Sequence, residues 1–195
     1  MKGETFVFFG IVGSGKGTQV KLLTEYLKNK DGKEVVYIGT GDIFRNIIAS
    51  NDPATQFIKD LVLQGTLIPD KETNDLVIKA TEEKLSRDKH VIYDGYPRTV
   101  AQAEIFSNIM QTHGRENIKI IYIELSPEEA MKRNLLRARE DDTEAGLAKR
   151  FAEYRDNVIP AMNYFKDKPG YTIYTIHGEQ SVEDVHKDII KSLGI

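Results

Sequence analysis

The sequence contains no cysteine and no tryptophan among its 195 residues. Without cysteine the chain can form no disulfide, carries no thiol nucleophile and offers no cysteine-held zinc or iron–sulfur site. A chain of this length buries about 70% of the surface that its unfolded form exposes, so it can fold as a single domain without such supports. Cysteine-free composition is compatible with a cytoplasmic protein, and we expect that location.

The sequence also lacks a large excess of charge of either sign and lacks long apolar runs. Lys and Arg number 27 against 30 Asp and Glu, which gives a formal net charge of −3. That balance does not favour nonspecific binding to nucleic acid or anionic lipid, although it is compatible with a small basic cleft. The apolar run Phe6–Phe9 is far shorter than the about 20 residues that cross a bilayer, and no leader pattern precedes it. We therefore expect neither nucleic acid nor membrane as a partner.

Short apolar runs alternate with longer amphipathic stretches, which predicts an α/β protein. The runs are Thr5–Phe9, Glu34–Ile38, His90–Tyr93, Lys119–Leu125 and Tyr171–Ile176. Each is nearly continuous and rich in Val, Ile, Phe or Tyr, as strands buried on both faces of a parallel sheet are. Ser181 is placed to cap a helix that reaches Leu193, and Ser126 with Glu129 forms a second helix start. The pattern predicts a three-layer sandwich around a five-stranded parallel sheet.

One region interrupts this alternation. Between the second and third predicted strands lie roughly 50 residues of helical character, far more than the dozen or so of a minimal crossover. Gly65 and Pro69 divide the region into segments. We interpret residues 41–85 as a small helical insertion within a single domain that spans residues 1–195.

A glycine-rich segment, Gly10 to Thr18, follows the first predicted strand and opens a predicted helix. It fits the G-x-x-x-x-G-K pattern of a phosphate loop, in the strand–loop–helix context that the pattern requires. Its glycines let successive backbone N–H groups point at one anion, and the helix N-terminus adds partial positive charge. Lys16 can reach the β- and γ-phosphates, while Gly17 stands where serine or threonine is usual. The segment predicts a nucleoside triphosphate but leaves GTPases, motors and small-molecule kinases open.

Two further segments narrow the function. Thr40–Arg45 follows the second predicted strand, and Asp94–Gln102, which begins Asp-Gly-Tyr-Pro-Arg, follows the third. With Gly13–Thr18 they resemble, in the same order, the three signature segments of adenylate kinase and its nucleoside-monophosphate kinase relatives. The resemblance covers nearly the whole chain. It implies a P-loop kinase fold whose insertion binds the monophosphate, and an enzyme that reversibly transfers a phosphoryl group from ATP to AMP, giving two ADP.

The resemblance also implies a donor site and a Mg²⁺ site, without zinc. The implied ATP-binding residues are Gly13, Ser14, Gly15, Lys16, Gly17, Thr18, Arg133, Arg137 and Gln180. Thr18 and Asp94 are the implied magnesium residues, acting largely through water, since hard oxygen ligands suit this cation. Arg133 has an alternative, because Glu129 lies one helical turn earlier and can pair with it. For Gln180 an ordinary strand–helix turn is nearly as good an interpretation.

The implied acceptor site draws on both signature segments and on the insertion. The implied AMP-binding residues are Thr40, Arg45, Thr66, Leu67, Ile68, Gly95, Tyr96, Pro97, Arg98, Gln102, Arg139 and Arg150. Arg45 and Arg98 would clamp the acceptor phosphate, because guanidinium forks match phosphate oxygens, and the Gln102 amide would read the base. The implied catalytic residues are Lys16, Arg45, Arg98, Arg139 and Arg150.

An acceptor phosphate needs no general base, because its second pKa is about 6 and it is largely deprotonated at pH 7. Asp42 could be mistaken for such a base. We interpret it instead as the N-cap of a helix from Ile43 onward.

The segment after Arg137 departs from the family pattern. Only Ala138 separates Arg137 from Arg139, although relatives carry a lid there that ranges from a short loop to a small domain. We expect the lid to be reduced to a short turn near residues 137–143 while its flanking arginines persist. The resemblance thus implies ATP, AMP and ADP as substrates of a monomer or small homo-oligomer. The alternatives are a UMP/CMP kinase and, less favoured, a nucleotide-binding regulator that has lost catalysis.

Overall fold

The computed structural model describes residues 2–50, 56–63, 68–137 and 143–195. Thr66, Leu67, Arg139 and most of the expected lid turn lie outside these residues. None of the helices in the described ranges is long and apolar enough to cross a membrane.

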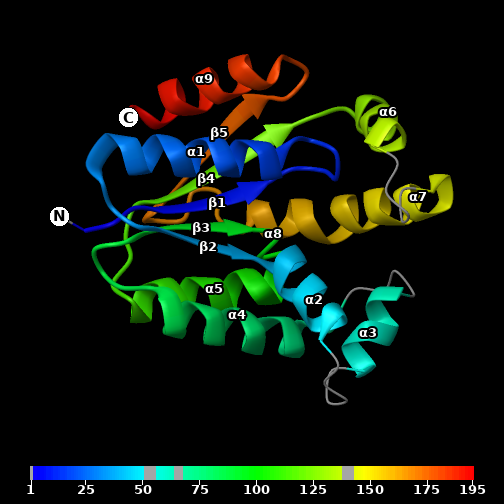
Figure 1. Cartoon of the computed structure of the whole chain (residues 1–195), viewed down its shortest axis with the longest axis horizontal. Coiled ribbons are helices and arrows are strands. Elements are labelled where there is room, and N and C mark those ends of the chain that lie inside the picture. The colour runs from blue at the N-terminus through cyan, green and yellow to red at the C-terminus, as the bar shows by residue number, and fades with distance from the viewer. Residues whose placement is uncertain (1, 51–55, 64–67, 138–142) are drawn as a thin grey trace.

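The described chain folds around one five-stranded sheet in which every neighbouring pair of strands is parallel (Figure 1). Its strands are β1 (Thr5–Phe9), β2 (Val35–Gly39), β3 (His90–Asp94), β4 (Ile118–Glu124) and β5 (Tyr171–His177), in the spatial order β2-β3-β1-β4-β5. The α/β prediction is confirmed, and each strand begins and ends within one residue of its predicted run. The apolar runs were informative because the central strands β1 and β3 are covered on both faces.

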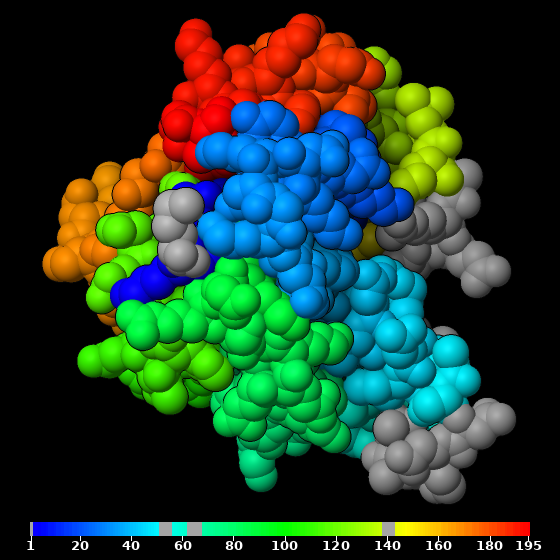
Figure 2. Space-filling model, turned by 60° about the vertical axis from the view of Figure 1, so that its left-hand side comes forward, coloured from blue at the N-terminus to red at the C-terminus, as the bar shows by residue number. Residues whose placement is uncertain are grey.

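Helices cover both faces of the sheet. On one face α1 (Lys16–Asp31) and α9 (Val182–Leu193) lie side by side, and Figure 2 shows α1 between α9 and the helices that follow β2. This layer is built around Leu23, Leu27 and Ile189. On the other face α4 (Asp70–Lys84), α5 (Val100–Thr112) and α8 (Ile159–Asn163) cover the larger apolar cluster, which includes Phe106 and Phe165. The predicted cap of α9 is confirmed, since the Ser181 hydroxyl accepts a hydrogen bond from the Asp184 N–H.

Three helices connect β2 to β3: α2 (Thr40–Ala49), α3 (Gln56–Leu63) and α4. They occupy the region where the sequence predicts a helical insertion, and α2 and α3 project beyond one end of the sheet (Figure 1). The predicted N-cap at Asp42 is wrong. Helix α2 begins at Thr40, directly after the end of β2, so Asp42 lies inside the first helical turn. There its carboxylate pairs with the Arg45 guanidinium.

The connection from β4 to β5 is helical as well. Helix α6 (Pro127–Arg137) is followed by α7 (Glu144–Glu153), a π-helical turn (η2, Tyr154–Val158) and α8. The Thr143 hydroxyl caps α7 by accepting from the Gly146 N–H. Helices α6 and α7 flank the same end of the sheet as α2 and α3, on its other side (Figure 1). The loop after β1 lies between these two groups of helices.

His90 links β3 to the end of α1. Its Nδ1 accepts from the Glu4 N–H, so Nε2 carries the proton and donates to the Asp31 carboxylate at 3.2 Å. Asp31 also accepts from the Lys33 ammonium at 2.8 Å. The Lys33 contacts, and then His90, hold the pKa of Asp31 well below its ordinary value of 3.8.

A carboxyl group whose pKa is depressed by folding stabilises the protein above its unfolded pKa and loses that contribution as pH falls. We expect Asp31→Asn to lower the free energy of unfolding at pH 7 by about 1 kcal/mol, allowing for solvent screening. The difference from the unsubstituted protein should shrink as pH falls below about 4. Urea unfolding at pH 7 and pH 3 measures it, with Asp75→Asn on the exposed side of α4 as the control. An equal difference at both pH values would contradict the prediction.

Candidate active site at the carboxyl ends of the strands

The loop between β1 and α1 has the geometry of an anion cradle. Gly13 and Gly15 both have φ of +89°, a left-handed conformation that a side chain would disfavour, and the Ser14 N–H donates to the Ile11 carbonyl at 3.1 Å. Helix α1 starts at the next residue, Lys16, so its N-terminal N–H groups face the loop. The Lys16 ammonium folds back over the loop and donates to the Gly10 carbonyl at 2.6 Å. The segment from Gly10 to Lys16 therefore has the local geometry that the predicted phosphate loop requires.

Lys16 is also the electrostatic centre of the site. Burial lowers its pKa from 10.5 to about 8, against the opposing effect of Asp94 at the end of β3. Arg98 and Arg137 are close enough to lower that pKa further. The fold thus brings Asp94, Arg98 and Arg137 close to the Lys16 ammonium, although they belong to separate parts of the chain. Such a set suits a highly charged anion, which would relieve the repulsion among the cations.

Asp94 is approached from the neighbouring strand by a tyrosine. The Tyr37 hydroxyl on β2 lies 3.4 Å from an Asp94 carboxylate oxygen, and burial together with Asp94 and Asp42 raises the pKa of Tyr37. The phenol fits because Gly39, two residues on and on the same face of β2, has no side chain. A Cβ at Gly39 would lie 2.1 Å from the Tyr37 hydroxyl oxygen. The hydroxyl keeps its proton and can donate to Asp94.

The segment after Asp94 turns back sharply toward the end of β2. Gly95 has φ of +77°, and its carbonyl accepts from the Thr40 hydroxyl at 2.8 Å and from Arg98 Nε at 2.7 Å. The Tyr96–Pro97 peptide bond is cis. The buried Tyr96 hydroxyl donates to Asn74 of α4 at 2.6 Å. These contacts fix the half-buried Arg98 beside Asp94 and turn its guanidinium toward the phosphate loop.

Gln102, the predicted reader of the acceptor base, is engaged at both ends of its amide. Its Nε2 donates to Asp70 at 2.8 Å, and its Oε1 accepts from the Arg98 N–H at 2.8 Å. Asp70, the first residue of α4, also accepts from the Thr99 hydroxyl at 2.8 Å. Of the predicted wall beside the base, the structure describes Ile68. This side chain is buried, two residues before Asp70 in the sequence. Asp70 was not predicted as a site residue, because an acid in a first helical turn has the helix dipole as a sufficient explanation.

The remaining arginines divide between the site and local pairs. Arg137 donates to the Asn134 side chain at 2.7 Å, and Arg150 Nε on α7 reaches the Gly146 carbonyl at 3.4 Å. Arg133 donates to Glu129 at 2.8 Å, so the helix pairing considered from the sequence is present. Arg45 pairs with Asp42 on the exposed side of α2. In this arrangement Arg137 shares the field of Lys16, whereas Arg45 and Arg133 are held by carboxylates of their own helices.

Comparison with known proteins decides the family. The profile of the adenylate kinase family matches residues 8–169. The chain belongs to the adenylate kinase family. It is 31% identical to adenylate kinase 1 of Nostoc sp. over 188 residues, covering 96% of this chain and 97% of the relative. It is 31% identical to the adenylate kinase of Thermus thermophilus over 197 residues (99% and 98%) and 34% identical to that of Corynebacterium diphtheriae over 188 residues (96% and 98%).

As an adenylate kinase, the enzyme transfers a phosphoryl group from ATP to AMP and forms two ADP. Enzymes of this family generally use Mg²⁺. The residues here fit that cation, because the Asp94 carboxylate and the exposed Thr18 hydroxyl are hard oxygen groups beside the phosphate loop. Within the described ranges no cluster of three or more acidic or histidine side chains could hold a metal alone.

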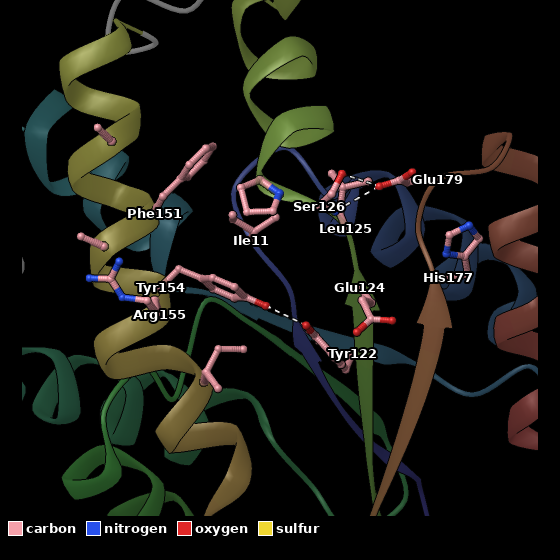
Figure 3. A pocket seen from close by; sticks show the side chains of 14 residues that line it. Ile11, Tyr122, Glu124, Leu125, Ser126, Phe151, Tyr154, Arg155, His177 and Glu179 are labelled. Atoms are coloured by element: carbon pink, nitrogen blue, oxygen red, sulfur yellow. Dashed lines mark hydrogen bonds between the residues drawn. The ribbon is translucent and has the colours of Figure 1, made fainter.

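The kinase has a hollow of about 680 Å³ next to the phosphate loop. Figure 3 shows it between α7 with η2 on one side and the ends of β4 and β5 on the other. Its floor includes Ile11 of the phosphate loop, and the Tyr154 hydroxyl donates to the Tyr122 hydroxyl across it at 3.1 Å. Glu179 at the rim accepts from the Ser126 hydroxyl. Sequence reasoning did not single out this hollow, because its lining comes from four distant segments.

The loop after β5 holds Gln180, the candidate for contact with the donor base. Its Nε2 donates to the His177 carbonyl at 2.8 Å and to Asp188 of α9 at 2.9 Å. These bonds are those of an ordinary strand–helix turn. The donor-base role of Gln180 stays a prediction.

Proposed function

We propose that this adenylate kinase binds the ATP phosphates on the Gly13–Thr18 loop and the AMP phosphate between Arg98 and Arg45. The observation that carries the proposal is the phosphate loop, with the Lys16 ammonium folded over it and with Arg98 and Arg137 near that ammonium. A cationic centre of this kind stabilises charge on a transferring phosphoryl group, which is most of what this chemistry requires. Arg150 and Arg139 would complete the clamp.

In the proposed mechanism the chain's residues align two nucleotides and neutralise their charge. Lys16 would leave the Gly10 carbonyl for the donor phosphates, and Arg45 would exchange Asp42 for the acceptor phosphate. The acceptor oxygen attacks without a general base, because it is already deprotonated near neutral pH. Asp94 and Thr18 would hold Mg²⁺ through water, and the bound cation would offset phosphate charge during transfer.

The acceptor is AMP in our proposal because Gln102 can offer one donor and one acceptor to an adenine edge. Thr40 and Thr99 also stand where relatives that prefer pyrimidines usually carry alanine and asparagine. A coupled assay of ADP formation from ATP with AMP, UMP or CMP tests this. Turnover with AMP at least about tenfold above the pyrimidine monophosphates is expected, for a discrimination of about 1.4 kcal/mol. Equal turnover with UMP or CMP would favour the pyrimidine alternative.

We further propose that the donor side is open. Helix α6 ends at Arg137 and α7 begins at Glu144, so residues 138–143 are all that the chain has between them. A cover of this size excludes little water and contacts little of the donor base.

We expect kcat/KM for GTP and CTP to lie within about tenfold of that for ATP, since an uncovered base contributes little binding energy. The same coupled assay with each donor at saturating AMP measures this. A preference for ATP above about a hundredfold would contradict it. A subunit partner could supply the missing cover, and full activity of a monomer in ultracentrifugation would remove that idea.

A further inference from the structure

Asn134, in the middle of α6, is fully buried and joins three parts of the donor side. Its Nδ2 donates to the Val12 carbonyl of the phosphate loop at 2.9 Å and to the Ala130 carbonyl of its own helix at 2.7 Å. Its Oδ1 accepts from Arg137 Nη2 at 2.7 Å. The amide nitrogen thus donates to the loop and to its own helix, and the amide oxygen accepts from an arginine.

The side chain is packed directly against the phosphate loop. A Cβ on Gly13 would lie 2.3 Å from Asn134 Nδ2, so the glycine leaves the space that the amide fills. A buried polar side chain in a helix interior costs free energy unless its partners compensate for lost water. An amide can donate to two carbonyls while its oxygen accepts from a guanidinium, whereas a hydroxyl has only one proton to donate.

The Arg137 guanidinium, on the other side of this amide, lies close to the proposed position of the donor phosphates. Arg137 lies near enough to lower the pKa of Lys16, whose ammonium donates to the Gly10 carbonyl of the phosphate loop. A long arginine side chain loses rotamer freedom when it binds an anion, and fixing it beforehand removes part of that cost. Asn134 supplies such a fixed point, three residues earlier on the same helix.

We propose that Asn134 is a positioning residue that fixes Arg137 to the phosphate loop, so that the donor phosphates meet a preformed site. The inference rests on the proposed role of Arg137 in donor binding. It explains how a kinase with few residues between α6 and α7 can order its donor arginine. The order comes from a contact beneath the phosphates and not from a cover above them.

The test measures ATP and AMP affinity separately by calorimetry, without Mg²⁺, so that no turnover occurs. Asn134→Ser keeps a hydroxyl that can donate to the Ala130 carbonyl but removes the contacts to Val12 and Arg137. We expect it to weaken ATP binding about tenfold and AMP binding less than twofold. Asn134→Leu, with an apolar side chain of similar size, should have the same effects on ATP and AMP binding. Thr81→Val, which removes a buried hydroxyl of α4, controls for lost stability and should leave ATP binding within about twofold.

A double-mutant cycle identifies the route of the effect. In an Arg137→Met background, Asn134→Ser should weaken ATP binding less than about threefold, because the arginine that it positions is gone. ATP affinity of Asn134→Ser within twofold of the unsubstituted enzyme would overturn the inference, as would equal losses for ATP and AMP. If Arg137→Met alone left ATP binding unchanged, the proposed role of Arg137 would fail and the inference with it. A loss on Arg137→Met without one on Asn134→Ser would overturn the inference alone.

Discussion

Replacing Lys16 by methionine is expected to lower kcat by about 10³-fold, since a preorganised charge at the transferring group is worth this much. Methionine keeps most of the aliphatic length but removes the cation that folds back over the Gly10–Lys16 loop. A coupled assay of ADP formation measures the loss. Lys21→Met, an exposed lysine further along α1, is the control and should keep wild-type turnover. More than a tenth of the activity surviving in Lys16→Met would remove the phosphate-loop role of this residue.

The same variant should be at least as stable as the unsubstituted enzyme. Folding lowers the pKa of Lys16 to about 8, which means that the folded site disfavours the charged lysine at neutral pH. For a lysine with a depressed pKa, the penalty is present below that pKa and fades as pH rises toward the unfolded value. Removing the charge at pH 7 is therefore expected to raise the free energy of unfolding by roughly 1–2 kcal/mol. A lower Tm with the lost activity would mean that turnover fell through unfolding.

Arg98→Met is expected to lower kcat/KM for AMP by about 10²- to 10³-fold, the second largest effect that we predict. Arg98 is fixed by its bond to the Gly95 carbonyl and lies close to both Asp94 and Lys16. Its loss removes charge from the point where we propose that acceptor and donor meet. Affinity for ATP measured without turnover should change less than about threefold. Steady-state kinetics with varied AMP and calorimetry with ATP separate the two.

Two companion variants sharpen that experiment. Arg98→Lys restores a charge but not the two-pronged guanidinium, so we expect it to recover less than about a tenth of the lost kcat/KM. Arg87→Met removes an exposed arginine before β3 and should leave both parameters unchanged. Recovery of full activity by Arg98→Lys would show that the phosphate needs only a charge at this point.

The strands of the sheet could be predicted closely because the pattern that indicates each strand lies within the strand's own residues. Thr5–Phe9 and His90–Asp94 are apolar on both faces, and no neighbouring residue has to be known to interpret such a run. Ser181 likewise caps the helix that it precedes. The N-cap prediction for Asp42 was wrong for a related reason. Strand β2 passes directly into α2, which leaves no residue between them for a separate cap, and α2 starts at Thr40, two residues before Asp42.

The support beneath the predicted site residues could not be predicted. Asn134 contacts Val12 across 122 positions of sequence, and Tyr37 reaches Asp94 across 57. Neither belongs to a pattern, and a lone asparagine or tyrosine in an amphipathic stretch has several ordinary explanations. Asp70 was hidden in the same way, because only the folded chain brings it to Gln102. Motifs identify the groups that face the ligand, while the residues that hold those groups depend on the tertiary fold.

The strand order has a consequence for how the two nucleotide sites can change. The helices between β2 and β3 are attached to one flank of β1, and those between β4 and β5 to the other, while the phosphate loop follows β1 itself. The two appendages share no strand and no connection. The parts that project beyond the sheet, α2 and α3 on one flank and α6 and α7 on the other, can each change without altering the register of the strands that carry the other pair. A chain can therefore keep three helices around its acceptor, leave only residues 138–143 between its donor-side helices, and preserve the loop between them.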